Sequence, residues 1–390
     1  MGVFDSKNFN SAVFQKYLET VPRVKQNALL KAGVLRTRND LKGLLVDQVG
    51  GNFISVPMSG RIGGNALNYD GDTDITATSL DTYLQNMIVV GRAKAWEEKD
   101  FSFDITGHDF MEDIASQVGD YWDDIDQLTI LKTLAGIFGV TTNSFTSEHT
   151  LDIALETGNS GADAYVGATT LNNAIQKAAG GNKDIFKVAI MHSQVATNLE
   201  NIQVISYWKE TDANGVQRPV ALASWNGRTV LVDDDAPIQS GYYASTSGAA
   251  GALKVVASSP SDGQIAIATV QAADFYPAGV AANDYVVAGV KYVTYLLGDA
   301  AFDYVDCGAK VPVETHRDPT TKGGKEMLIT RQRKVFAPRG FSFVQPVSPV
   351  ISPSDTNLAT ADCWTPVVAT DGSTYFPNKA FPFARILSKG

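Results

Sequence analysis

The longest periodic hydrophobic pattern in the chain runs from residue 109 to residue 138. Apolar side chains recur there every three or four positions, the spacing that places them on one face of an α-helix. The stripe consists of Phe110, Ile114, Val118, Tyr121, Trp122, Ile125, Leu128, Leu131, Leu134, Ala135 and Phe138. Gly139 follows, so the pattern predicts a helix of about 30 residues and roughly 45 Å, a length typical of a structural spine. The polar positions between these residues predict its solvent face, whose acids are Asp120, Asp123, Asp124 and Asp126.

Before this helix, the hydrophobic pattern changes twice. Apolar residues at helical spacing predict short helices in residues 1–45. From residue 46 to residue 106, clustered glycines separate β-type runs at 52–57 and 83–90. Two such runs joined by a long segment predict a two-stranded excursion with its tip near Asn68–Asp74.

After the helix, helical and strand periods alternate. The elements predicted between 165 and 236 are helices at 169–179 and 193–202 and strands at 184–191 and 229–232. This mixture indicates an α/β or α+β unit. A stretch rich in Ala, Gly and Ser predicts a small β insertion at 240–288, with strands at 252–257 and 264–270. The remaining predicted elements are strands at 291–297, 310–314, 326–333 and 340–344.

Composition removes several classes of protein. With 44% hydrophobic and 19% charged residues, the 390-residue chain can bury a sizeable core. Cys307 and Cys363 are the only cysteines and lie 56 residues apart, so we expect neither a zinc knuckle nor a disulfide framework. No apolar run approaches the roughly 18 residues of a membrane helix, and the first residues do not form a secretory signal. A net charge of −10 disfavours a protein whose main task is to grip nucleic acid.

The charge is distributed in blocks. Residues 1–45 carry eight bases and three acids, a net of +5, and residues 309–340 carry the same numbers. Between them, residues 107–139 carry seven acids and one base, a net of −6. Blocks of opposite charge allow the chain to pair with itself or with other copies, and the alternative is a solvated surface without a preferred partner.

Catalytic signatures are absent from the sequence. There is no phosphate-binding loop, dinucleotide fingerprint, nucleophile elbow or zinc-protease motif. Asp233, Asp234 and Asp235 follow a predicted strand and are the candidate ligands for a metal-dependent hydrolase. No further acid or lysine completes such a site, so we expect no cofactor, no metal and no enzyme activity.

A series of segments, taken in order from 68 to 344, resembles the major capsid proteins of tailed bacteriophages with the Hong Kong 97-type shell fold. The segments are Asn68–Gly71, Gly91–Trp96, His108–Trp122, Leu134–Phe138, Val232–Pro237, Tyr292–Gly298, Pro312–Asp318, Leu328–Arg331 and Pro338–Phe341. The resemblance implies an α+β fold with an N-terminal arm, an extended loop, a peripheral domain and an axial domain. The implied boundaries are 1–45 for the arm, 46–106 for the extended loop, 107–139 for the spine helix, 140–300 for the axial domain including the 240–288 insertion, 301–350 for peripheral strands and 351–390 for a C-terminal segment.

The resemblance also implies a function. The chain would self-assemble into hexamers and pentamers of an icosahedral virion shell, built in the cytoplasm of the bacterial host. The implied partners are other copies, a scaffolding protein, a portal, a decoration protein and the enclosed double-stranded DNA. An encapsulin-like cellular compartment shares this fold and is the alternative, whereas a tail-tube protein would lack the long helix.

Interface residues are predicted from charge. We expect the base of the extended loop to offer charged side chains to a basic group on a neighbouring copy. The residues at the base are Arg92, Lys94, Glu97 and Glu98, and those on the neighbour are Arg317, Arg331 and Arg333. Solvated or intramolecular charges are the alternative, because exposed ion pairs contribute only about 0–1 kcal/mol each.

Overall fold

The computed structural model separates into two compact units. It describes residues 33–46, 52–60, 62, 65–69, 74, 77, 80–100, 110–155, 164–211 and 217–390. Among the described residues, unit 1 comprises Leu35–Asn143 and Phe302–Pro377, and unit 2 comprises residues 33–34, Ser144–Ala301 and Asn378–Gly390. Most of the predicted N-terminal arm lies outside the described residues. The division into arm, loop, peripheral and axial domains stays a prediction.

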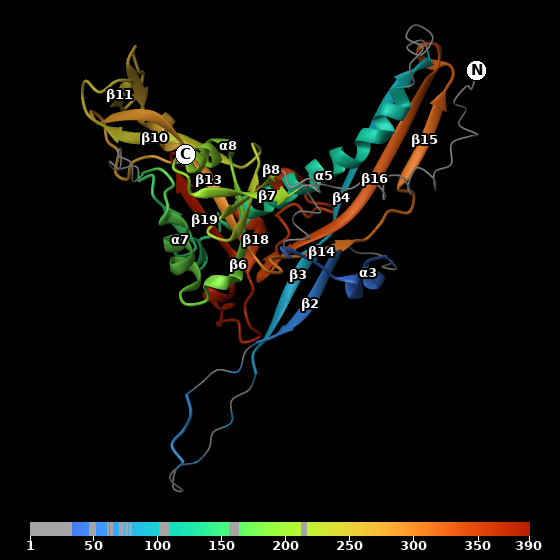
Figure 1. The fold of residues 1–390 in the computed structure, drawn as a ribbon, viewed down its shortest axis with the longest axis horizontal. Helices are drawn as coiled ribbons and strands as arrows, with labels where there is room; N and C mark the ends of the chain where they lie inside the picture. Colours follow the sequence, from blue (N-terminus) through green and yellow to red (C-terminus); the bar gives the residue numbers. More distant parts are fainter. Residues whose placement is uncertain are drawn as a thin grey trace. The chain divides into compact units, whose positions relative to one another are not determined.

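Unit 1 is built on a five-stranded sheet in the order β1-β14-β16-β15, with β4 on the other edge of β16 (Figure 1). The strands are β1 (Leu35–Thr37), β4 (Val90–Lys99), β14 (Phe302–Asp306), β15 (Val313–Asp318) and β16 (Lys325–Pro338). The β16 strand spans 14 residues, so one edge pairs with β4 and the other with β15 and then β14. The strand predicted at 310–314 begins later in the structure, as β15 at Val313. The strand predicted at 326–333 is longer in the structure, because β16 extends to Pro338.

The predicted long helix is confirmed as α5 (Phe110–Ile137), which packs along β4 and β16 (Figure 1). Val118 and Trp122 form a core cluster with Val313 and Leu328 of the sheet. The expectation that its acids all face solvent is wrong for two of them, because Asp123 and Asp126 are each 4% exposed.

A two-stranded excursion is also confirmed. In it, β2 (Phe53–Ser59) pairs antiparallel with β3 (Thr82–Ile88), from Phe53 opposite Ile88 to Ser59 opposite Thr82. Most of the predicted tip lies outside the described residues. The smaller elements of unit 1 are α3 (Asn39–Val46), β17 (Phe341–Phe343), α10 (Asp355–Ala359), β18 (Trp364–Pro366) and the 3-10 turns Thr321–Gly323 and Ala361–Cys363.

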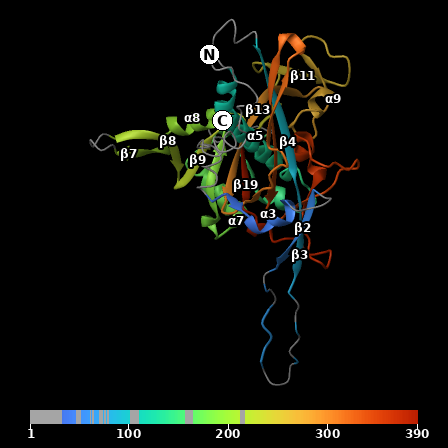
Figure 2. The same cartoon turned by 90° about the vertical axis from the view of Figure 1, so that its right-hand side faces the viewer.

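Unit 2 contains a ten-stranded sheet centred on β13 (Tyr285–Gly298). Its main path is β12-β11-β13-β6-β9-β8-β7, with β10 and β19 also paired to β13 and β5 paired to β19. The remaining elements of its central part are α6 (Phe145–Glu148), β5 (Thr150–Asp152), α7 (Thr170–Ala179), β6 (Phe186–Met191), α8 (Ser193–Asn201), β7 (Ile205–Thr211), β8 (Gln217–Trp225), β9 (Arg228–Val232), β19 (Phe383–Ser388) and the 3-10 turns Lys183–Ile185 and Asn378–Ala380. The predicted helices in this unit are confirmed. The β7–β8 pair, which lies side by side in Figure 2, was not predicted.

The 240–288 stretch has the predicted β structure and continues the main sheet of unit 2, whereas its status as an insertion stays a prediction. It consists of β10 (Ile238–Ser245), β11 (Ala252–Val256), β12 (Gln264–Ala266) and α9 (Ile267–Gln271), followed by the start of β13. The strand predicted at 264–270 is wrong beyond Ala266, because the chain turns into α9 and buries Val270 among Val255, Ile265 and Val286.

Candidate assembly surface

The sheet of unit 1 has two chemically different faces where β4, β16 and β15 run together. Side chains of directly opposed residues in an antiparallel pair lie on the same face, and successive residues alternate between faces. Leu328 is opposed to Trp96, and both belong to the cluster beneath α5. Between Lys325 and Lys334, the even-numbered residues of β16 therefore face α5, and the odd-numbered residues form the outer face.

The face beneath α5 is closed by polar contacts as well as by apolar packing. The Trp122 Nε1–H donates to Thr330 Oγ1 at 3.2 Å. Further along, Lys334 Nζ lies 2.5 Å from Asp126 Oδ2, and both side chains are buried. Gln332 reaches the same carboxylate at 3.5 Å. A buried acid facing a buried lysine fixes the position of the helix along β16.

The seven predicted interface residues divide between the two faces. Arg92, Lys94, Glu98 and Arg317 alternate toward α5, and Glu97, Arg331 and Arg333 lie on the outer face. The structure therefore does not gather them into one patch.

On the α5 side, the predicted arginines bind acids of their own chain. Arg92 donates to Asp355 Oδ1 at 2.6 Å and to the carbonyl of Pro353 at 2.8 Å. Arg317 donates to Asp100 Oδ2 at 2.6 Å. These contacts hold neighbouring loops against the strand ends.

The outer face carries weaker contacts. Glu97 and Lys325 approach to 3.4 Å, Arg331 and Glu314 to 3.0 Å, and Arg333 donates to Asn52 Oδ1 at 3.3 Å. Exposed pairs of this kind add little to folding and can exchange partners when another surface arrives. Pairing of these residues across copies stays a prediction.

Apolar side chains gather on the same outer face. Ala93 and Ala95 of β4 are exposed, and Met327 and Ile329 of β16 are half-buried. Because the two alanines are small, these four residues form a flat apolar surface between the charged groups.

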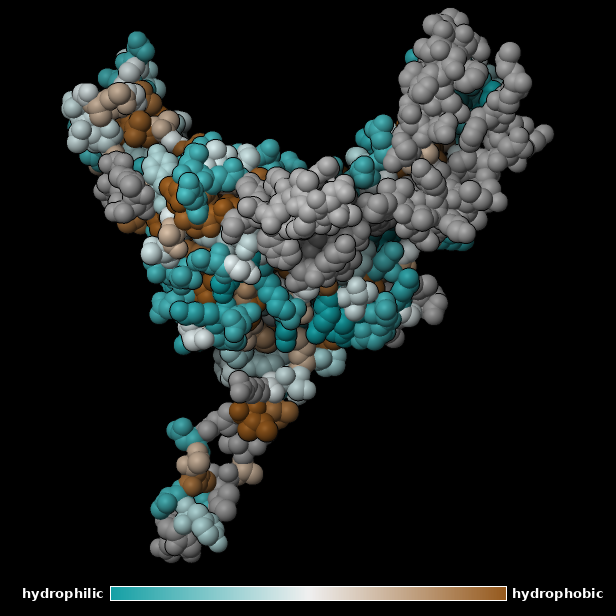
Figure 3. All heavy atoms as spheres, viewed as in Figure 1, coloured by the Kyte–Doolittle hydropathy of each residue, from teal (hydrophilic) through white to brown (hydrophobic). Residues whose placement is uncertain are grey.

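The β2–β3 excursion carries exposed apolar side chains that the sequence reasoning did not single out. Tyr69 is 90% exposed and Ile62 is 86% exposed. Leu67, Leu80 and Leu84 are also exposed, and Figure 3 shows hydrophobic residues along this part of the chain. The signal in the sequence was large apolar residues within a segment otherwise rich in Gly, Asn and Asp.

The base of the excursion is firmly attached to unit 1. Gln85 is buried and its Nε2 donates to the carbonyls of Pro338 at 2.7 Å and Phe341 at 3.1 Å. Tyr83 packs edge-on against Phe376 at a centroid distance of 5.9 Å. The strands therefore project their far residues from a rigid base.

The three consecutive aspartates after β9 form a turn. Asp233 is buried, and its Oδ1 accepts the Asp235 N–H at 3.1 Å. Asp234 is exposed, and hydrogen bonding to Ser193 lowers its pKa. Within the described residues, no three His, Cys, Asp or Glu side chains are grouped so that they could hold a metal ion. The described residues therefore offer no grouped ligands for the metal ion that the hydrolase alternative requires.

Comparison with known proteins decides the fold. No protein-family model matches the chain. Its sequence is 22% identical over 339 residues to the major capsid protein of Bacillus phage SPP1, covering 87% of this chain and 86% of the phage protein. Its structure is similar to the capsid of Ralstonia phage GP4, with a TM-score of 0.50 and 13% identity over 79% of this chain and 84% of that chain. The chain has a phage capsid fold.

The predicted α+β fold of Hong Kong 97 type is thereby confirmed. The sequence likeness and the structural likeness each span most of the chain. Among the described residues, no helix is both long and apolar enough to cross a membrane.

Proposed function

We propose that the chain is the major shell subunit of a tailed-phage capsid and that it assembles into hexamers and pentamers of an icosahedral shell. The observation that carries the proposal is sequence similarity to a phage major capsid protein over 87% of the chain, together with the capsid fold. A shell subunit needs no reacting groups, and its work is done by surfaces that bind other copies.

The β2–β3 excursion and the outer face of the unit 1 sheet are the proposed contact surfaces. Contacts between unlike surfaces of identical chains generate closed rings when the rotation closes. The exposed Tyr69 and Ile62 gain free energy when a neighbouring copy covers them, about 1.5–3 kcal/mol for a fully buried apolar side chain. In this proposal the flat apolar surface around Ala93 and Ala95 buries these two side chains. Glu97 and Arg331, at the sides of that surface, fix the alignment of one copy on the next.

The proposed partners are those of a shell under construction. A scaffolding protein and a portal would act during assembly in the host cytoplasm, and a decoration protein would bind the finished virion. A subunit with a net charge of −10 encloses double-stranded DNA without gripping it, because tight binding requires cations that neutralise phosphates.

Electron microscopy of the purified full chain, alone and co-expressed with a candidate scaffold, tests the proposal. Closed shells, or rings of five and six subunits, are the expected result. Shells that contain a specific cargo protein in place of nucleic acid would favour the cellular compartment. A monomer or dimer under every condition, scaffold included, would overturn the proposal.

A further inference from the structure

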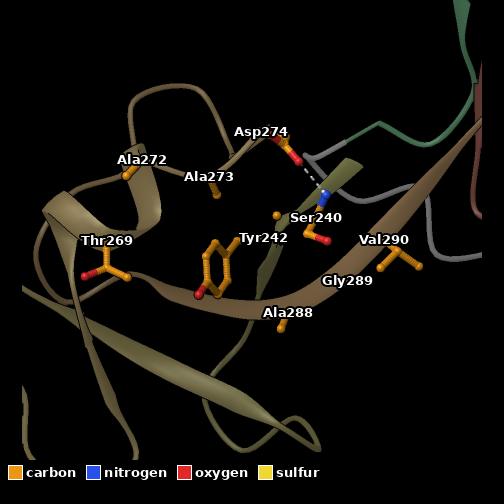
Figure 4. A pocket seen from close by; sticks show the side chains of 10 residues that line it. Ser240, Tyr242, Thr269, Ala272, Ala273, Asp274, Ala288, Gly289 and Val290 are labelled. Carbon is orange, nitrogen blue, oxygen red and sulfur yellow. Dashed lines mark hydrogen bonds between the residues drawn. The ribbon is translucent and has the colours of Figure 1, made fainter. Parts of the chain in front are cut away.

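The insertion of unit 2 contains an open groove of about 750 Å³, which lies outside the contact surfaces proposed above (Figure 4). Sites for small molecules usually span about 300–1,000 Å³ and combine an apolar lining with a few placed polar groups. One wall is the β10–β13 strand pair and the other is the end of α9 with the segment after it.

The β10–β13 wall is apolar at its centre. Tyr242 is opposed to Ala288 and Ser240 is opposed to Val290, so these four side chains share one face of the pair. Figure 4 shows the Tyr242 ring between Thr269 and Ala288. A half-buried aromatic ring beside small residues leaves room for a flat ligand to lie against it.

The second wall is held in place by backbone bonds. The Tyr242 N–H donates to the Phe275 carbonyl at 3.0 Å, and the Asp274 N–H donates to the Ser240 carbonyl at 3.1 Å. The Ser240 N–H in turn donates to Asp274 Oδ2 at 2.8 Å. These bonds fix the carboxylate at the rim before any ligand arrives.

Close packing of two glycines supports this geometry. A Cβ on Gly241 would overlap the carbonyl oxygen of Phe275, and a Cβ on Gly289 would overlap the ring of Tyr243. Gly241 therefore lets the backbone at Phe275 lie close to β10, and Gly289 leaves space for the Tyr243 ring.

The chemistry of the lining selects a class of ligand. The ten lining residues include no lysine, arginine or histidine, which disfavours phosphate and other anions. Asp274 is the single carboxylate, too few for a divalent cation site. A purely apolar ligand would cover the exposed polar side chains of Ser240, Thr269 and Asp274 without forming hydrogen bonds to them.

We propose that this groove binds a neutral carbohydrate. One face of a sugar ring presents C–H groups, which pack on an aromatic ring such as that of Tyr242. Its hydroxyls at the edge both donate and accept, which suits the Ser240 and Thr269 hydroxyls and the Asp274 carboxylate. The open mouth of the groove lets a longer glycan continue beyond it. None of the groove residues belongs to the contact surfaces proposed for shell formation.

Saturation-transfer NMR with the full chain and glucose, galactose, mannose or N-acetylglucosamine tests the proposal. We expect at least one sugar to bind with a Kd of about 1 mM. Tyr242→Ala and Asp274→Ala should each weaken that binding about tenfold or more, which corresponds to roughly 1.4 kcal/mol. The matched controls Tyr276→Ala and Asp262→Ala alter the same insertion outside the groove and should leave binding unchanged.

A blocking variant keeps the test decisive if Tyr242→Ala disturbs folding. Ala288 is exposed, so Ala288→Phe places a ring in the groove without entering the core. It should abolish the saturation-transfer signal. No signal from any of the four sugars, or an undiminished signal from Ala288→Phe, would overturn the proposal whether or not the chain forms shells.

Discussion

The buried Lys334–Asp126 pair shows how one residue of the spine helix is committed to the sheet. Removing one partner leaves an uncompensated buried charge, which lowers the free energy of unfolding by about 3–5 kcal/mol. We therefore expect Asp126→Ala to lower the free energy of unfolding by about that amount, measured by urea denaturation. The exposed Asp124 on the same helix is the matched control, and Asp124→Ala should change it by about 0.5 kcal/mol or less. Equal effects of the two variants would contradict the pairing.

Asp126 also shows where the prediction from the sequence was wrong. Asp126 lies four residues after Trp122 and so on the same helical face, a relationship visible in the sequence. Its acidic side chain was nevertheless assigned to solvent, because the compensating Lys334 is 208 residues away in the chain. A buried charge can be recognised from sequence only when its partner is local.

His149 makes the stability of unit 2 depend on pH. The side chain is 1% exposed, and burial lowers its pKa below the ordinary value of 6.5. The carbonyls of Phe383 and Asn378, at 2.5 and 2.9 Å, and the nearby Glu148 oppose this shift without cancelling it. The folded state disfavours the charged imidazolium. The neutral His149 ring therefore contributes its full share to the free energy of unfolding above pH 6.5, and this contribution is lost as the pH falls below that value.

The test compares two histidine variants by urea denaturation across this pH range. His149→Phe should remove the loss of stability on acidification that the parent chain shows between neutral and mildly acidic pH. The exposed His316 provides the control, because His316→Gln should retain the parent profile. An unchanged profile for His149→Phe would show that other groups cause the acid sensitivity.

At the scale of elements, the end of α5 depends on a glycine with no room for a side chain. A Cβ on Gly136 would overlap the Leu358 carbonyl oxygen and lie 2.7 Å from the Trp364 ring. Alanine favours a helix by about 1 kcal/mol over glycine, but the overlap forces α10 and β18 away. We expect Gly136→Ala to lower the melting temperature. Gly43 in α3 has nothing within 4 Å of its Cβ position, so Gly43→Ala should raise it, and a rise in both would refute the overlap argument.

Elements with local signals were predictable, and those defined by distant partners were not. The α5 helix and the β2–β3 excursion follow from periodicity and glycine spacing within a short stretch of chain. By contrast, β19 is a strand because it lies between β13 and β5, whose partner residues are some 90 and 235 positions away. The α9 segment has strand-like composition, and only its packing of Val270 into the insertion core makes it a helix.

At the scale of the whole molecule, the proposed interface predicts that the outer face of the unit 1 sheet affects assembly and that the face beneath α5 affects folding. Glu97 lies on the outer face, and its neighbour Glu98 points toward α5. Glu97→Lys should reduce the yield of shells or rings in electron micrographs while leaving the melting temperature of the subunit unchanged. Glu98→Lys is the matched control and should act on the melting temperature. Normal assembly by Glu97→Lys would remove this face from the proposed interface.

The exposed apolar residues of the β2–β3 excursion give the sharpest test of the shell proposal. Ile62 and Tyr69 contribute almost nothing to the isolated fold, because 86% and 90% of their surfaces face water. The double variant Ile62→Ser, Tyr69→Ser should therefore keep the parent melting temperature. It should also lose closed shells, since each side chain buried against a neighbour contributes about 1.5–3 kcal/mol and an icosahedral shell repeats that contact in every subunit.

The control for this double variant is an exposed tyrosine outside the excursion. Tyr165 in unit 2 is 47% exposed, and Tyr165→Ser removes a comparable ring from the surface. Sedimentation velocity separates subunits, rings and shells and would quantify each fraction for the three proteins. If assembly is lost only in the excursion variant, the β2–β3 excursion is the segment that contacts neighbouring copies. Shells formed at the parent yield by the double variant would place the joining contacts elsewhere on the subunit, while leaving the capsid fold itself intact.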